Sequence, residues 1–289
     1  MTFTKAERRK AYIKLAITGT AGSGKTYSAL RLARGLVGKK GRIAVIDTEN
    51  GSATLYSNLT DFDHCEIQPR TGGSFHYIDF IEKIKEAEAA GYDCVIIDSA
   101  SHLWQGILDS KTELDKKGGN SFTNWAESGK QFNTAIQQFL QSKLHVISCI
   151  RSKTEYVVET NEKGKQAPRK IGLAPVMRDG IEYEFTTVFD VNIDHTVTVS
   201  KDRTSLFVHE GSFQITEETG KKIADWIDGG VDAPEPSNEV IAIAEQIRSR
   251  VKGNSDMMAT VKSLCNGKRL EELPEAMLIN IAKTVGLTA

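Results

Sequence analysis

The chain has 289 residues, of which 39% are hydrophobic and 26% charged, so it can bury a full-sized core, and we expect one large domain with a small appendage. Its 37 Lys and Arg against 38 Asp and Glu exclude an overall basic coat, so any nucleic acid would contact a local patch. Four scattered cysteines argue against a disulfide framework or a zinc site. Without a membrane-length apolar run or a secretory signal, we expect a cytoplasmic protein with no membrane partner.

Short apolar runs alternate with helical patterns along the first part of the chain. This alternation predicts an α/β core with a mostly parallel central sheet flanked by helices. The expected strands are Lys14–Thr18, Arg42–Asp47, Cys94–Asp98 and Leu144–Ile150, and the expected helices are Lys25–Leu36, His76–Ala90 and Asn124–Gln141.

The pattern changes after residue 180. Tyr183–Asp194, Thr196–Ser200 and Ser205–His209 are predicted to be strands added antiparallel to the sheet, and Glu217–Ile227 is predicted to be a closing helix. A stretch rich in Gly, Pro and Asp then ends all periodicity. We therefore expect a core over residues 1–230, a linker over 231–238 and a small all-helical domain over 239–289, whose third helix opens at Pro274.

A phosphate-binding loop is the strongest motif of the sequence. It directly follows the first expected strand and opens the first expected helix, which is the context this motif requires. Its residues, all predicted to contact nucleotide, are Gly19, Thr20, Ala21, Gly22, Ser23, Gly24, Lys25 and Thr26. Lys25 would reach the β- and γ-phosphates of ATP, and the Thr26 hydroxyl would ligate Mg2+.

Acidic residues end two of the expected strands. Asp98 closes the apolar run Cys94–Ile97, where a carboxylate that holds the metal belongs. Asp47 and Glu49 follow the second strand, and hydrolysis needs a carboxylate that orients the attacking water. Position favours Glu49 for this role and a structural role for Asp47, but the residues alone do not decide between them.

Three segments together resemble the RecA recombinase core in order and spacing: Val45–Asn50, Gln68–Gly72 and Val95–Ser99. The resemblance implies that Glu49 is the catalytic glutamate and that Tyr56 stacks on adenine, although Tyr56 could equally be an ordinary half-buried aromatic residue. It also implies that Lys201 and Arg203 cross a subunit interface to the γ-phosphate of a neighbouring protomer, so that the active form is an oligomer. Otherwise these two are solvated charges on a hairpin.

One position departs from the RecA pattern. A glutamine in that family senses the γ-phosphate after the fourth strand, and Cys149 stands there in this chain. The coupling of ATP to nucleic acid is therefore in question, and Ser148, Arg151 or a nearby glutamine could substitute. Residues 12–230 also resemble a narrower group, the bacteriophage RecA-like ATPases associated with single-strand annealing and recombination.

RecA-type cores bind single-stranded DNA through two mobile loops, which correspond here to Asp109–Phe122 and Ser152–Arg178. Between Arg151 and Arg178, seven basic residues against three acidic ones give a net charge of +4 in a chain of net −1. The alternative is a solvated hairpin tip. The candidate contacts to DNA are Lys111, Lys116, Lys117, Arg151, Lys153, Lys163, Lys165, Arg169, Lys170 and Arg178.

These patterns predict a Mg-ATP-dependent ATPase that binds single-stranded DNA as a homo-oligomer and promotes annealing or strand exchange in phage recombination. One alternative is a ring-forming motor of the same fold that translocates on DNA. Another is an ATP-gated adaptor whose helical tail recruits a single-strand-binding protein.

Overall fold

The structure is a computed structural model that describes residues 5–70, 72–118, 120–160, 166–231, 237–265 and 269–287, apart from the side chains of 154–160, 166–173 and 272. It divides into two compact units, residues 1–230 and 231–289.

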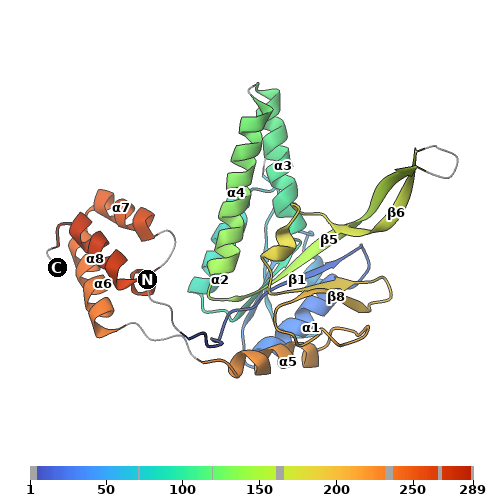
Figure 1. The fold of residues 1–289 in the computed structure, drawn as a ribbon, viewed down its shortest axis with the longest axis horizontal. Coiled ribbons are helices and arrows are strands. Elements are labelled where there is room, and N and C mark those ends of the chain that lie inside the picture. Colours follow the sequence, from blue (N-terminus) through green and yellow to red (C-terminus); the bar gives the residue numbers. More distant parts are fainter. Residues whose placement is uncertain are drawn as a thin grey trace. The chain divides into compact units, whose positions relative to one another are not determined.

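The first unit is built on an eight-stranded sheet (Figure 1). Seven strands follow the order β3-β2-β4-β5-β1-β7-β8, and β6 pairs with β5 outside this order. All pairs along the sheet are parallel except β7 with β8. The strands are β1 (Lys14–Gly19), β2 (Ile43–Asp47), β3 (Asp63–Glu66), β4 (Cys94–Asp98), β5 (His145–Thr160), β6 (Gln166–Pro175), β7 (Thr187–Val191) and β8 (Val197–Asp202).

Helices cover both faces of the sheet because its central strands are apolar on both sides. On β4, Val95 and Ile97 belong to one core cluster while Cys94 and Ile96 belong to the other, as the alternation of a strand requires. The first cluster packs against α2 (Tyr77–Ala89), α3 (Ser101–Lys116) and α4 (Ser121–Gln141), and the second against α1 (Lys25–Val37) and α5 (Glu217–Asp228). The predicted α/β core with a mostly parallel sheet is confirmed.

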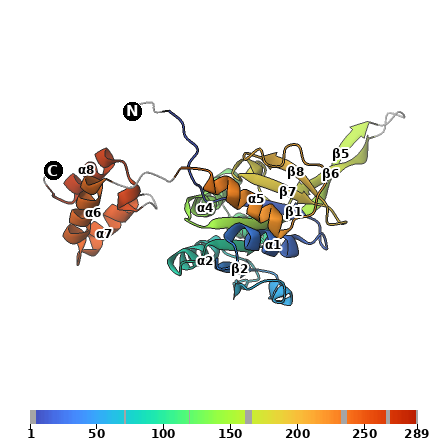
Figure 2. The ribbon, with the colours of Figure 1, turned by 90° about the horizontal axis from the view of Figure 1, so that it is seen from below.

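Two long hairpins extend from this core. β5 runs on past the sheet and pairs with β6 as an antiparallel ribbon, from Ser152 opposite Pro175 to Thr160 opposite Gln166. This ribbon projects from the sheet in two views at right angles (Figures 1 and 2). Helices α3 and α4 form a helical hairpin that stands away from the sheet (Figure 1).

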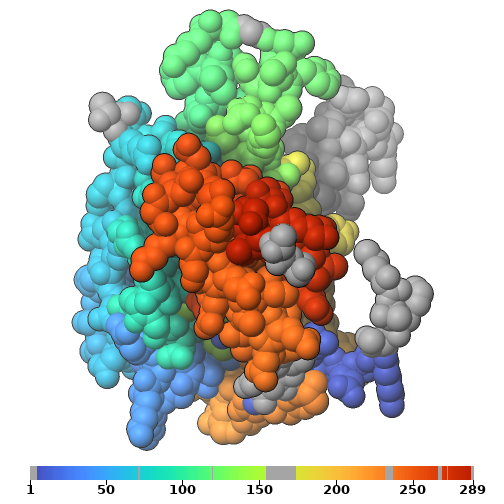
Figure 3. Space-filling model, turned by 90° about the vertical axis from the view of Figure 1, so that its left-hand side faces the viewer, coloured from blue at the N-terminus to red at the C-terminus, as the bar shows by residue number. Residues whose placement is uncertain are grey.

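The second unit has a core of its own. It contains α6 (Asn238–Val251), α7 (Ser255–Cys265) and α8 (Glu275–Thr284), coloured orange to red in Figure 3. Ala244, Ile247 and Leu278 are fully buried there. Ser237 caps α6 by accepting a hydrogen bond from the Val240 amide, and Pro274 precedes the first residue of α8.

Several expected elements differ from the structure. Of the segments expected to be mobile loops, residues 109–118 and 120–122 belong to the end of α3, the tip of the helical hairpin and the start of α4. The described part of Ser152–Arg178 is mostly the β5–β6 ribbon, and residues 161–165 lie outside the described residues. β7 is parallel to β1 rather than antiparallel, and Ser205–His209 forms turns instead of a strand. Phe207 is nevertheless buried against Phe189, which explains its apolar pattern.

Candidate nucleotide-binding site

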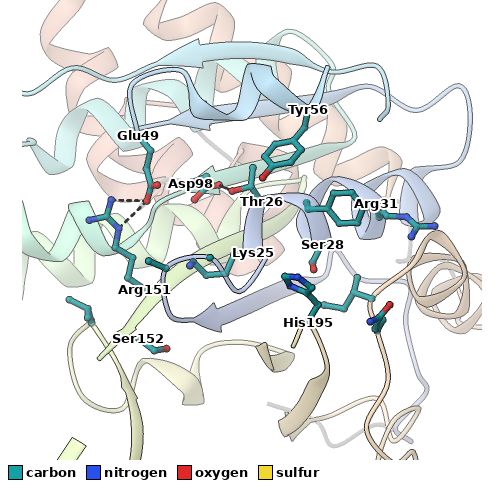
Figure 4. A pocket seen from close by; sticks show the side chains of 17 residues that line it. Lys25, Thr26, Ser28, Arg31, Glu49, Tyr56, Asp98, Arg151, Ser152 and His195 are labelled. Carbon is teal, nitrogen blue, oxygen red and sulfur yellow. Dashed lines mark hydrogen bonds and ion pairs between the residues drawn. The ribbon is translucent and has the colours of Figure 1, made fainter. Parts of the chain in front are cut away.

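The candidate site lies beyond the carboxyl ends of β1, β2 and β4, beside the point where β5 leaves the sheet. Parallel strands bring these ends to one edge of the sheet, where open α/β folds bind their ligands. A cavity of about 970 Å3 opens there. Lys25, Thr26, Glu49, Tyr56 and Asp98 line it, although they come from separate parts of the chain (Figure 4).

The loop between β1 and α1 has the conformation that a phosphate cradle requires. Gly22 and Gly24 have φ values of +79° and +89°, in the region that favours glycine. A Cβ on Gly19 would lie 2.4 Å from Ser23 Oγ and 2.7 Å from Val191 O, so this position has no room for a side chain. Gly24 caps α1 without a side-chain hydrogen bond. The first amides of this helix therefore have no side-chain cap, which suits an anion.

Lys25 and Thr26 begin α1 at the floor of the cavity. The Lys25 ammonium donates to the Thr20 carbonyl oxygen at 2.9 Å, and the Thr26 hydroxyl donates to Asp98 Oδ2 at 2.5 Å. Asp98 is buried at the end of β4, and desolvation raises the pKa of its carboxyl to about 6 although the Thr26 hydrogen bond lowers it.

The fit of Mg2+ can be judged from these oxygens. No group of three or more His, Cys, Asp or Glu that could hold a metal ion occurs among the described residues. A hydroxyl and one carboxylate side by side are nevertheless the set that Mg2+ uses when phosphate oxygens and water complete its shell. Thr26 and Asp98 therefore fit this ion.

Asp47 and Glu49 follow one another at the end of β2 but lie in different surroundings. Asp47 is fully buried and accepts hydrogen bonds from the backbone amides of Glu49, at 2.5 Å, and Ala53, at 2.9 Å. Its carboxylate also lies 3.3 Å from His64 Nε2. Asp47 thus holds the turn after β2, and that turn directs the partly exposed Glu49 side chain toward the cavity. This arrangement is the one expected of a structural Asp47, and of the two carboxylates it is Glu49 that lines the cavity.

Arg151 was expected either to contact DNA or to stand in for the absent sensor glutamine, and it lines the cavity. Its guanidinium donates a hydrogen bond from Nε to Glu49 Oε1 at 2.9 Å, and its Nη2 lies 2.8 Å from the same oxygen in an ion pair (Figure 4). Cys149, two residues earlier, is fully buried, and desolvation raises the pKa of its thiol well above the usual value. A buried, neutral thiol is unsuited to sensing phosphate, whereas Arg151 lies beside the phosphate loop.

His195 and Tyr56 form other parts of the cavity wall. His195 has a φ of +67° in the turn between β7 and β8, and its Nδ1 lies 2.9 Å from the Ser23 carbonyl oxygen. No motif marked it, because the contact depends on a turn far along the chain. Tyr56 is half-buried and lines the cavity. Its ring packs edge-on against that of Tyr27, with the two ring centroids 6.1 Å apart.

Lys201 and Arg203 do not line the cavity of their own chain. The Lys201 ammonium donates to the backbone carbonyl oxygens of Glu182, at 2.7 Å, and Tyr183, at 2.8 Å. Arg203 also donates to the Tyr183 carbonyl oxygen, at 2.8 Å. Lys201 is on β8, the last strand of the sheet order, and Arg203 directly follows it. Backbone hydrogen bonds thus hold both cations at the sheet edge.

The residues predicted to contact DNA are spread over three places. On α3, Lys111 pairs with Asp115 and Lys116 with Glu113, so helical ion pairs already use both cations, while Lys117 is exposed at the tip. Lys153 is exposed at the base of the ribbon. Arg178 comes shortly after the ribbon in the sequence, and its guanidinium donates a hydrogen bond to Asn133 Oδ1. Lys163 and Lys165 lie outside the described residues, as do the side chains of Arg169 and Lys170.

No helix in the described ranges has the length and apolar content needed to cross a bilayer.

Comparison with known proteins identifies the family. A search of curated proteins found no significant match. A protein-family model described as an AAA domain matches residues 11–220, which include every element of the cavity. The chain therefore belongs to the AAA domain family, with a P-loop ATPase core.

Proposed function

We propose that the chain is a Mg-ATP-dependent ATPase that assembles on single-stranded DNA and promotes annealing or strand exchange in phage recombination. The observation that carries the ATPase part is the convergence of Lys25, Thr26, Asp98 and Glu49 on one cavity (Figure 4). The DNA part is supported by the basic character of residues 151–178 and by the resemblance to recombination ATPases.

Each cavity residue has a distinct chemical role in this proposal. Lys25 and the first amides of α1 bind the β- and γ-phosphates. Thr26 and Asp98 hold Mg2+, which when bound neutralises charge on the phosphate oxygens. Glu49 orients water and accepts its proton, so that the water oxygen bonds to the γ-phosphorus while the bond to the ADP oxygen breaks.

Lys25→Ala tests the ATPase. We expect at least ~100-fold slower phosphate release in the presence of Mg2+, because one charge that stabilises the transferring phosphoryl group is lost. Lys40→Ala is the matched control, because Lys40 is exposed in the turn before β2, at the amino ends of the strands and away from the cavity. Turnover unaffected by Lys25→Ala would contradict the proposal.

The proposed oligomer places Lys201 and Arg203 in the cavity of a neighbouring protomer. Their fixed positions away from their own cavity support this. Arg203→Ala should then bind nucleotide normally but hydrolyse it slowly. Mixed with Lys25→Ala protein, it should regain activity, because intact Arg203 from one variant completes the intact phosphate loop of the other. A mixture as inactive as its components would contradict assembly across the interface.

Binding of DNA is tested by fluorescence anisotropy with labelled oligo-dT across a salt series. We expect affinity to fall steeply with salt, since Lys and Arg displace counterions from phosphates. Lys153→Glu should weaken binding and make the salt slope shallower, while Lys40→Glu should change neither. Absence of binding at low salt, with and without Mg-ATP, would contradict the DNA role.

The separate core formed by α6, α7 and α8 favours a second candidate, an adaptor that recruits a single-strand-binding protein. Deleting residues 231–289 should then abolish co-purification with that protein while ATP hydrolysis remains. Loss of both activities would instead show that the second unit supports the ATPase itself.

A further inference from the structure

Arg151 lies at the junction between the cavity and the β5–β6 ribbon. In the sheet it is paired with Gly19, the first residue of the phosphate loop. Its backbone is held on both sides: the amide donates to Ser101 Oγ at 2.9 Å, and the carbonyl accepts from the Val176 amide at 2.6 Å. The backbone is therefore fixed, and only the side chain is free to change partners.

The present partner of that side chain is Glu49. The Nε hydrogen bond and the Nη2 ion-pair contact both end on Glu49 Oε1, which places a cation against the carboxylate assigned to orient water. A carboxylate oxygen that already contacts two guanidinium nitrogens is not free to turn toward a water molecule. The contact thus keeps Glu49 from orienting water.

This ion pair is built to be exchanged. The Arg151 side chain is 46% exposed and that of Glu49 29%, and ion pairs in contact with water are weak. A terminal phosphate on the adjacent loop carries more negative charge than one carboxylate, and it matches the two parallel donors of arginine.

We propose that Arg151 is the residue that recognises the γ-phosphate: it holds Glu49 until a nucleoside triphosphate enters, then turns to the terminal phosphate and leaves Glu49 free to orient water. This inference rests on the proposed ATPase function. It supplies the sensing that buried Cys149 does not, and it places the sensor on the strand that continues into the ribbon.

The test compares affinities for ADP and for the non-hydrolysable triphosphate AMP-PNP, both with Mg2+, by calorimetry on the full chain. Arg151→Ala should weaken AMP-PNP binding about 10-fold or more, the effect of one charge-assisted hydrogen bond. ADP binding should change less than about twofold. Arg151→Lys, which keeps the charge but loses the paired donors, should give an intermediate loss and guards against a folding defect.

Glu49→Gln probes the other side of the exchange. Because it removes the charge that competes for Arg151, AMP-PNP should bind more tightly while ADP affinity stays unchanged. The gain should disappear in the double variant with Arg151→Ala, since no guanidinium is left to release.

Arg70→Ala is the matched control. Arg70 also gives two donors to one carboxylate, that of Asp79, and its side chain is similarly exposed, at 51%, but it lies outside the cavity. It should leave both affinities unchanged. Equal losses for ADP and AMP-PNP in Arg151→Ala, or no loss, would overturn the inference while the ATPase stands. Failure of the wild-type protein to bind either nucleotide would overturn both.

Discussion

Two polar side chains buried at opposite ends of the central strands, Lys14 and Asp98, differ in the number of their hydrogen-bond partners. At the amino end of β1, the Lys14 ammonium is buried and donates to Ser142 O, Ser142 Oγ and Leu144 O at 2.9, 3.0 and 2.6 Å. At the carboxyl edge, Asp98 is equally buried but receives one side-chain hydrogen bond, from Thr26. Ser23 Oγ nearby has no partner among the described residues.

This difference separates structural polar groups from functional ones. Folding alone favours a complete set of partners, because an unpaired buried polar group is costly. Groups that keep spare hydrogen-bonding capacity at a cavity are available to a ligand. Substitutions of the cavity-lining residues at the carboxyl ends should therefore change activity more than stability, and those of Lys14 and its partners at the amino ends should do the reverse.

The largest effect should come from Asp98→Asn. Loss of the ionised carboxylate should slow ATP hydrolysis about 100- to 1,000-fold, because the metal charge would no longer be held beside the phosphates. Asp93→Asn is the control at the amino end of the same strand, where Asp93 accepts from the Arg42 amide. Comparable losses of turnover in both variants would break the contrast between the edges.

Lys14→Met should change how stability depends on pH. Burial lowers the pKa of Lys14 from 10.5 to about 7, so between these values the unfolded chain binds more protons and unfolding free energy rises with pH. The contribution approaches about 1.4 kcal/mol per pH unit. Urea unfolding from pH 7 to 10 should lose this rise in the variant, with turnover per folded molecule unchanged. An unaltered slope would show that Lys14 stays protonated throughout.

Tyr56→Ala should weaken ATP binding about 10-fold, the effect of one lost stacking contact with a base. Tyr56→Phe should retain most of the affinity, because the ring face remains. Tyr12→Ala is the control, since Tyr12 is a half-exposed tyrosine at the amino edge. Full affinity in Tyr56→Ala would remove the ring from the adenine site.

The smallest effect should be that of Ser148→Ala. Its hydroxyl is buried in β5 and has no partner among the described residues, so its removal should raise the unfolding free energy by up to about 1 kcal/mol. Ser142→Ala should instead lower it by about 1 kcal/mol, because Ser142 Oγ accepts from Lys14 and donates to Phe139 O. Thermal denaturation of the two variants should therefore shift in opposite directions.

Local patterns predicted the central elements well. The strand Cys94–Asp98 has the expected bounds, and the helix at Lys25 begins where the glycines end. These signals are local, since apolar runs and phosphate-loop glycines act within a few residues of themselves. The prediction failed where polar elements project from the core. The α3–α4 tip and the β5–β6 ribbon carry no clear apolar periodicity in their sequences, so the sequence predicted loops there.

The sequence by itself determined the α/β class, the phosphate loop and the identities of Lys25, Thr26 and Asp98, because each depends on local chemistry in a known strand or helix context. Only the tertiary structure placed Arg151 against Glu49 and His195 against the phosphate loop. The first contact joins residues 102 positions apart in the sequence, and the second joins residues 172 positions apart. The order of the strands in the sheet brings these residues together. That order is set by packing of the whole core, which no short segment encodes.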